Sequence, residues 1–204
     1  ERKLFYDELM CGVVGTKLSM LSLGFLHDMN VGYTVDFTGA ETMRWGADDG
    51  CGPHLHRCNT AAGLRDKYFC FAEPATTQSQ PACTWDYASV GFCHVGTSTS
   101  AFPQAFQYYT ASNVGGASPF MDGCPVVAGY SNRRCNVDTP ESSDDVILGH
   151  TFSQNGRCLV GTGIIQSGFS STRVDGPRCV EVQCTSANVV SFRVGGSGSY
   201  TQCG

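Results

Sequence analysis

The sequence has few charged residues and no concentrated basic segment. Charged residues make up 15% of the chain, the formal net charge is -5, and no run of positive side chains is longer than the pair Arg133-Arg134. Because a nucleic-acid-binding protein needs a concentrated basic patch to neutralise phosphates, we expect no nucleic-acid partner. The hydrophobic fraction of 41% is that of a folded globular protein rather than a disordered chain.

The common catalytic signatures are also absent. The sequence contains no HExxH, no GxSxG and no glycine-rich loop with a P-loop lysine. These absences exclude a helical zinc-protease site, a nucleophile elbow and a P-loop phosphate site from within these residues.

Long apolar runs are missing as well. The longest mostly apolar stretch, Leu18 to Leu26, is interrupted by Ser19, Ser22 and Gly24 and is too short to cross a bilayer. No signal peptide is visible either. We therefore expect that a segment upstream of this chain has been removed, and that membrane association is possible only through segments outside it.

Cysteine, by contrast, is abundant. The twelve cysteines are Cys11, Cys51, Cys58, Cys70, Cys83, Cys93, Cys124, Cys135, Cys158, Cys179, Cys184 and Cys203. This density is typical of disulfides formed in an oxidising compartment, and it predicts an extracellular or cell-surface protein. The alternative, zinc held by thiolates, normally shows as paired CxxC motifs, and none occurs.

The spacing of apolar residues predicts one helix. Residues 13–30 have helical spacing, and we expect this helix to be largely buried. Its apolar face comprises Val14, Leu18, Leu21, Phe25 and Met29, and it is widened by Met20, Leu23 and Leu26. Asn30 and Gly32 suit the end of this helix, because both tolerate the left-handed conformation of a C-cap.

Beyond residue 33 the sequence consists of short segments with strand-forming residues, separated by turn residues. The strands that we expect are Cys158–Gln166, Arg178–Gln183 and Asn188–Val194. Thr139-Pro140-Glu141 could begin a short helix, with Thr139 as its N-cap. The sequence therefore predicts an α+β protein, in which one helical segment precedes a disulfide-rich, mostly β domain.

Few side chains suggest a metal site. His54-Leu55-His56 would place two imidazoles on one face if it formed a strand, as some metal sites require. The alternative is a loop between disulfides that carries two exposed histidines. Asp48-Asp49 and Asp144-Asp145 lack the spaced oxygen ligands of a calcium loop, so we interpret them as turn residues.

A series of short motifs runs along the whole chain. They are Asp7-Glu8-Leu9-Met10, Asp36-Phe37, Ala40-Glu41, Trp45-Gly46, Gly50-Cys51, Phe106-Gln107-Tyr108-Tyr109-Thr110, Phe120-Met121-Asp122, Cys124-Pro125-Val126-Val127, Tyr130-Ser131, Val182-Gln183-Cys184 and Tyr200-Thr201-Gln202-Cys203. Each motif is weak by itself. Their order, together with the spacing of all the cysteines except Cys11, resembles the leishmanolysin family of surface zinc metalloproteases.

The resemblance implies a division of the chain at residue 35. Residues 1–35 would be the end of a metzincin catalytic domain, and residues 36–204 a cysteine-rich, mostly β domain that is truncated at its end. In metzincins three histidines bind zinc, a glutamate polarises the attacking water, and a methionine lies in a turn beneath the metal. Met10 matches this Met-turn methionine, and the histidines are expected upstream of Glu1. The alternative for Met10 is an ordinary core residue.

The residues after a Met-turn commonly form a wall of the substrate's S1′ pocket, and Val13 and Val14 occupy that place. Their side chains imply an apolar pocket. Cys11-Gly12 stands where the family has a small residue and a proline, and this departure leaves the shape of the pocket open.

The resemblance also implies disulfide pairs. They are Cys58 with Cys124, Cys70 with Cys93, Cys83 with Cys158, and Cys135 with Cys179. Cys51 would pair with a cysteine of the upstream catalytic segment, and Cys184 and Cys203 with cysteines beyond Gly204.

The resulting hypothesis is the C-terminal segment of an extracellular or cell-surface zinc-dependent endopeptidase. Its partners would be the upstream catalytic segment and protein or peptide substrates. Zinc would belong to the full-length protein and not to this chain alone, which would be inactive by itself. The alternative is a non-catalytic adhesion or structural module of the same fold, and a third hypothesis is a metal-binding module through His54 and His56.

Overall fold

The computed structural model describes residues 3–12, 17–32, 34–72, 81–138, 149–165, 173–186, 189–194 and 198–202. The chain divides into two compact units, each made of two segments. Unit 1 comprises Glu1–Phe71 and Val95–Pro125, and unit 2 comprises Ala72–His94 and Val126–Gly204. The expected boundary at residue 35 is not tested by this division, and it stays a prediction.

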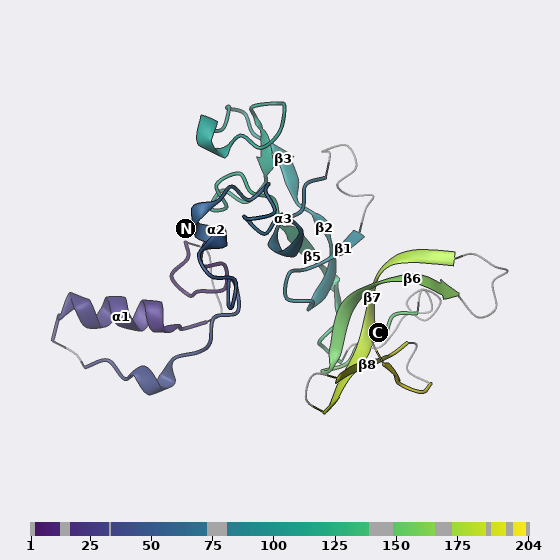
Figure 1. Cartoon of the computed structure of the whole chain (residues 1–204). Helices are drawn as coiled ribbons and strands as arrows, with labels where there is room; N and C mark the ends of the chain where they lie inside the picture. Colours follow the sequence, from purple (N-terminus) through teal and green to yellow (C-terminus); the bar gives the residue numbers. More distant parts are fainter. Residues whose placement is uncertain are drawn as a thin grey trace. The chain divides into compact units, whose positions relative to one another are not determined.

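Unit 1 contains the helices and one small sheet (Figure 1). Its elements are α1 (Met20–Met29), η1 (Phe37–Gly39), α2 (Gly52–Leu55), α3 (Arg65–Tyr68), β3 (Val95–Thr97), η3 (Gln104–Phe106) and β4 (Val114–Gly116). Strands β3 and β4 pair in antiparallel fashion. Among the described residues, α1 is the longest helix, which agrees with the predicted α+β class.

Helix α1 begins later than its spacing predicts. Ser19 is the N-cap, and its hydroxyl accepts a hydrogen bond from the Leu21 amide. Residues 17 and 18 are extended, because Lys17 pairs with the backbone of Asp7 and Leu9. A helix cannot include residues whose backbone groups bond elsewhere. The C-terminus is as predicted, since Asn30 is the left-handed C-cap with φ 47°.

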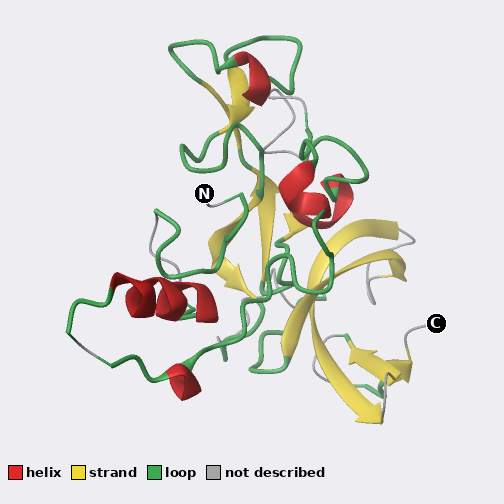
Figure 2. Cartoon of the chain, turned by 60° about the vertical axis from the view of Figure 1, so that its left-hand side comes forward, coloured by secondary structure: helices red, strands yellow, loops and turns green. Residues whose placement is uncertain are grey.

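The prediction that the apolar face of α1 is largely buried is wrong for most of its described residues. Leu21 is 48% exposed, Phe25 59% and Met29 46%. Leu23, which widens this face, is buried as predicted, and Ser22 is buried beside it. Figure 2 shows α1 in red. The spacing identifies the side chains that share a face, but it does not show whether the chain itself supplies a surface to cover them.

The core of unit 1 is an aromatic cluster around Trp45. The Trp45 side chain is 1% exposed. Its ring stacks on Tyr6 at a centroid distance of 4.6 Å, and it contacts Tyr68 at 4.4 Å and Phe69 at 5.7 Å. Burial of such large rings dominates the stabilisation of a small core, so this cluster anchors the N-terminal segment to the rest of unit 1.

Unit 2 is made of two antiparallel sheets. The first has the order β1-β2-β5, and the second has the order β6-β7-β8-β9. The strands are β1 (Pro81–Cys83), β2 (Ser89–Cys93), β5 (Val127–Arg134), β6 (Gly156–Ile165), β7 (Arg173–Ser186), β8 (Val189–Arg193) and β9 (Thr201–Gln202). Strands β6, β7 and β8 confirm the three predicted strands. The predicted helix start at Thr139 lies outside the described residues.

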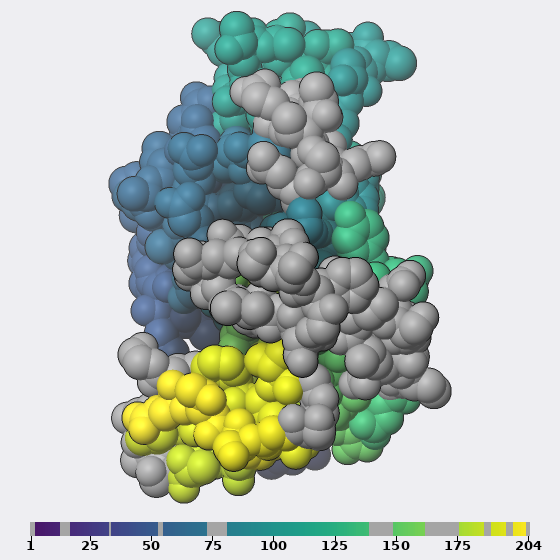
Figure 3. All heavy atoms as spheres, turned by 90° about the vertical axis from the view of Figure 1, so that its right-hand side faces the viewer, coloured from purple at the N-terminus to yellow at the C-terminus, as the bar shows by residue number. Residues whose placement is uncertain are grey.

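The described C-terminal residues lie at the surface of unit 2. Tyr200, Thr201 and Gln202 are exposed. Figure 3 shows the C-terminal part of the described chain in yellow. The core of this unit instead combines cystines with apolar side chains, namely Val90, Cys135, Phe152, Cys158 and Cys179.

Disulfides bond most of the described cysteines. The structure pairs Cys58 with Cys124, Cys83 with Cys158, and Cys135 with Cys179, as the resemblance implies. Cys70 and Cys93 are disulfide-bonded too. Cys51 and Cys184 are exposed and form no disulfide within the described part of the chain. Cys203 lies outside the described residues.

Candidate functional site

The segment that carries Met10 is a tight turn held by backbone hydrogen bonds. The Glu8 amide donates to Phe5 O at 3.1 Å, and the Cys11 amide donates to Glu8 O at 3.3 Å. A parallel bridge joins Glu8 to Lys17. Met10 itself is 64% exposed. It is therefore not an ordinary core residue of this chain.

Asp7 holds one side of this turn. Its carboxylate accepts hydrogen bonds from the amides of Arg44 at 2.9 Å and Trp45 at 3.4 Å. The Trp45 indole donates to Lys3 O at 2.9 Å. Asp7 thus ties the turn to the aromatic core, because the backbone that it holds is that of the central tryptophan.

Glu8 holds the other side and is buried, with 4% of its surface exposed. Its carboxylate accepts hydrogen bonds from the Ser19 and Ser22 hydroxyls and, at 3.1 Å, from the Leu9 amide. A buried charge is tolerated only where hydrogen bonds replace its water. Here the donors come from the start of α1 and from the turn itself, so Glu8 joins these two elements.

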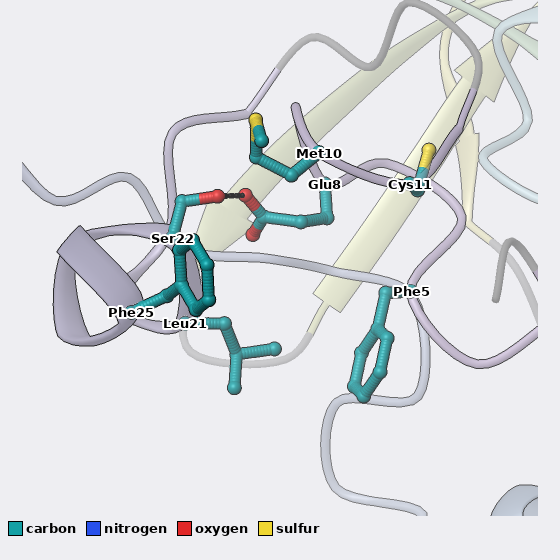
Figure 4. Close-up of a pocket in the computed structure, with 7 residues that line it drawn as sticks. All are labelled: Phe5, Glu8, Met10, Cys11, Leu21, Ser22 and Phe25. Atoms are coloured by element: carbon teal, nitrogen blue, oxygen red, sulfur yellow. Dashed lines mark hydrogen bonds between the residues drawn. The ribbon is translucent and has the colours of Figure 1, made fainter. Parts of the chain in front are cut away.

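A pocket of about 390 Å³ lies between the turn and α1. Its lining is mostly apolar and consists of Phe5, Glu8, Met10, Cys11, Leu21, Ser22 and Phe25. Figure 4 shows the Ser22 hydroxyl directed at the Glu8 carboxylate, with Met10 beside this pair. Such a pocket suits an apolar side chain better than a charged group.

The structure describes some of the predicted site residues and not others. Met10 lies in the turn and lines the pocket, but its place beneath a metal stays a prediction. Val13 and Val14 lie outside the described residues, so their predicted role in a substrate pocket also stays a prediction. Cys11 is buried, and its Sγ lies 3.5 Å from Tyr6 O.

The strand geometry required for a metal site at His54 and His56 does not form. Residues 52–55 form the short helix α2, and His56 is its C-cap. Gly52 and Pro53 begin this helix, and proline suits the first positions of a helix. In the described part of the chain, no group of three or more His, Cys, Asp or Glu side chains is placed to hold a metal ion.

Asp49 takes part in an internal network. Its carboxylate accepts from Lys67 Nζ at 2.7 and 2.8 Å and from the Tyr68 hydroxyl at 2.5 Å. These bonds hold the pKa of Asp49 below its usual range. Asp48 is a turn residue with φ 64°, whereas Asp144 and Asp145 lie outside the described residues.

The anchoring roles of Asp7 and Glu8 were not predicted from the sequence. A serine directly before the apolar run, Ser19, is the ordinary signal for a helix start, and it could have placed the beginning of α1. No local pattern, however, pairs Glu8 with Ser19 and Ser22, because the contact depends on how the chain folds back between residues 8 and 19.

None of the helices within the described ranges has both the length and the apolar character needed to cross a membrane.

Comparison with known proteins gives one family throughout. A sequence model of the family described as leishmanolysin matches residues 1–204. The leishmanolysin of Leishmania tropica is 30% identical over 200 residues, which cover 97% of this chain and 30% of that protein. Leishmanolysin of Leishmania major is 30% identical over 202 residues, with coverages of 97% and 32%.

A leishmanolysin homolog of Crithidia fasciculata is 29% identical over 202 residues, again with 97% of this chain covered and 30% of that protein. The chain thus spans less than a third of the length of these curated relatives.

Proposed function

This chain belongs to the leishmanolysin family of zinc metalloproteases, and from that premise we propose that it is the C-terminal segment of an extracellular or cell-surface zinc endopeptidase. The observation that carries the proposal is that the family match covers residues 1–204 although no HExxH occurs among them. The catalytic motif of such an enzyme would therefore lie in another part of the same protein.

The described residues of this chain do not fit a zinc site. Its described part offers no cluster of three or more potential ligands, and a catalytic zinc normally takes three protein ligands. We therefore place the zinc ligands outside the chain and expect no peptidase activity from the chain alone. What it would contribute is the Met10 turn and the apolar pocket beside α1.

The substrates would be proteins or peptides. The apolar lining of the pocket and the predicted role of Val13 and Val14 both favour contact with apolar side chains. A protein of this kind would need no nucleic-acid partner, in keeping with the net charge of -5.

The upstream catalytic segment is the proposed covalent partner, through a disulfide to Cys51. The exposure of Cys51 and its lack of a disulfide within the described residues support this role. The same reasoning applies to Cys184, for a partner in a segment that follows. Cysteine density of this kind favours an oxidising compartment, and hence an extracellular or cell-surface location.

A non-catalytic adhesion or structural module is the second candidate. It is favoured by Cys11-Gly12, which replaces the small residue and proline expected after the Met-turn methionine. The two candidates differ in the upstream sequence, because an adhesion module does not need intact zinc ligands.

The test uses the full-length protein and a quenched peptide substrate with apolar side chains. Activity that a chelator abolishes and added zinc restores supports the enzyme. Full-length protein that is folded, contains zinc in no more than trace amounts and cleaves nothing would instead support the adhesion module.

A further inference from the structure

Glu8 contacts both elements that form the pocket. Its two carboxylate oxygens accept from hydroxyls at the start of α1, namely Ser19 and Ser22, and Oε1 also accepts from the Leu9 amide at 3.1 Å. Leu9 directly precedes Met10. One buried carboxylate therefore lies between the first turn of the helix and the turn that carries Met10.

Hydrogen bonds of this kind are specific in length and direction. A bond to an ionised carboxylate is roughly twice as strong as a neutral one and is shorter. The N-terminus of a helix also favours a negative charge, because its free amides carry a partial positive charge. Since the Leu9 amide and the Ser22 hydroxyl share Oε1, a shift of the helix relative to the turn breaks one of the two bonds.

We propose that Glu8 is a positioning residue, which fixes Met10 relative to Leu21 and Phe25 and so sets the width of the pocket. Within the described residues, the Met10 side chain is 64% exposed and so is not fixed by burial. The backbone of the turn also pairs with Lys17, two residues before the N-cap of α1. The other side-chain bonds of the turn lead elsewhere, since Asp7 holds the backbone of Arg44 and Trp45. Among these side-chain bonds, those of Glu8 reach the helix itself. An effect of Glu8 on peptide cleavage rests on the proposed function, whereas its effect on the turn does not.

Glu41 is a matched control. Its carboxylate also supports the start of α1, where it accepts from the Leu18 amide at 3.0 Å and from Lys17 Nζ at 2.9 Å. The Glu41 carboxylate has neither of the bonds that Glu8 makes to Leu9 and Ser22. Replacing Glu41 therefore disturbs the helix start without removing the link to Met10.

The first arm of the test measures amide hydrogen exchange in the 204-residue chain. Glu8→Ala and Ser22→Ala should each speed exchange at Leu9 and Lys17 on the order of tenfold, because charge-assisted bonds are lost. Alanine favours the helix at position 22, so Ser22→Ala keeps α1 folded. Glu8→Gln, which retains one oxygen, should give a smaller change, and Glu41→Gln should leave exchange at Leu9 unchanged.

Two further measurements complete the first arm, namely a control for folding and a second readout at Met10. Exchange at Val182 in β7 should be the same in every variant, which shows that unit 2 remains folded. The Met10 methyl resonance should move in Glu8→Ala and Ser22→Ala by similar amounts, and the double variant should add little. The proposal would be overturned if the Leu9 amide of Glu8→Ala exchanged at the wild-type rate. It would also be overturned if Glu41→Gln sped exchange at Leu9 as much as Glu8→Ala does.

The second arm measures kinetics in the full-length protein. If Glu8 positions Met10 for catalysis, Glu8→Ala and Ser22→Ala should lower kcat roughly 10- to 100-fold, as loss of supporting residues commonly does. KM should change less than about threefold, and Glu8→Gln should recover part of kcat. An unchanged kcat in an active enzyme overturns the catalytic part of the proposal. A wild-type protein without activity overturns the proposed function instead, and the exchange arm still decides the role of Glu8.

Discussion

At the scale of single residues, Asp49 shows how one side chain connects several parts of unit 1. It accepts hydrogen bonds from Lys67 and Tyr68, and the Tyr68 hydroxyl in turn accepts from the Gly46 amide at 3.0 Å. Burial is the main reason why the pKa of Tyr68 is raised, and its bond to Asp49 adds to this. The network holds the loop of residues 46–49 against the ring that packs on Trp45.

The stability contributed by Asp49 should depend on pH. The hydrogen bond from Lys67, followed by that from Tyr68, holds the pKa of Asp49 below its usual range. A depressed carboxylate pKa in the folded state stabilises the protein above the unfolded-state value of about 4, and this stabilisation is lost as the pH falls through the folded-state value.

Asp49→Asn should therefore be less stable than wild type at pH 7 and approach it in acid, as judged by urea unfolding at several pH values. The control is Asp66, whose side chain is 93% exposed, and Asp66→Asn should change stability little at pH 7. A deficit of Asp49→Asn that stays constant from neutral pH to about pH 2 would contradict the assignment.

The same scale shows which site residues a sequence can identify. The family resemblance implied a turn at Met10, and the structure places Met10 in the lining of a pocket with Phe5, Leu21 and Phe25. Glu8 belongs to the same motif, yet its partners lie 11 and 14 residues away. Contacts of this kind depend on the path of the chain, so sequence spacing alone does not reveal them.

At the scale of elements, α1 was predicted from its apolar spacing and its C-cap. The start was misplaced because backbone pairing of residues 17 and 18 outweighs their helical pattern. Strand β8 shows a related limit. The alternation of Val190 and Phe192 identifies the strand, but its buried residue is Ser191. Periodicity finds the element and its faces, whereas neighbours decide which face is covered.

Gly24 offers a test of the local energetics of α1. It lies inside the helix, and a Cβ added there would meet nothing within 4 Å. Gly24→Ala should therefore raise the stability of unit 1 by up to about 1 kcal/mol, because alanine loses less backbone freedom in a helix. Circular dichroism and amide exchange across residues 20–29 provide the measurement.

Gly91 is the contrasting control in β2. A Cβ there would lie 2.0 Å from Ala128 O of the paired strand β5. Gly91→Ala should therefore destabilise unit 2, whose amide protection would fall. If Gly24→Ala lowered the helicity of α1 instead, residue 24 would make contacts that the structure does not show.

At the scale of the whole molecule, disulfide-bonded cysteines make up much of the core of unit 2. Three of the five residues of the core cluster in unit 2 are disulfide-bonded cysteines, namely Cys135, Cys158 and Cys179. The cysteine count was sufficient to predict disulfides, but not their pairs, since many connectivities are possible for such a number. The pairs were expected from the family resemblance.

Removal of one disulfide should destabilise unit 2 strongly. Cys135 and Cys179 are separated by 44 residues. Replacing both with alanine should lower the free energy of unfolding by about 2–5 kcal/mol, mainly because the unfolded chain gains freedom. Cys184 is exposed and not disulfide-bonded within the described residues, so Cys184→Ser in the 204-residue chain is the control and should change stability by less than about 0.5 kcal/mol. Equal effects of the two changes in urea unfolding would contradict the assigned role of the bridge.

The central claim is that this chain supports a zinc peptidase without containing its catalytic centre. The most direct measurement compares hydrolysis of one peptide substrate by the purified 204-residue chain and by the full-length protein, both with zinc present. The account predicts turnover by the full-length protein, abolished by chelation, and none by the chain at equal molar concentration. Zinc-dependent turnover by the pure chain would contradict it.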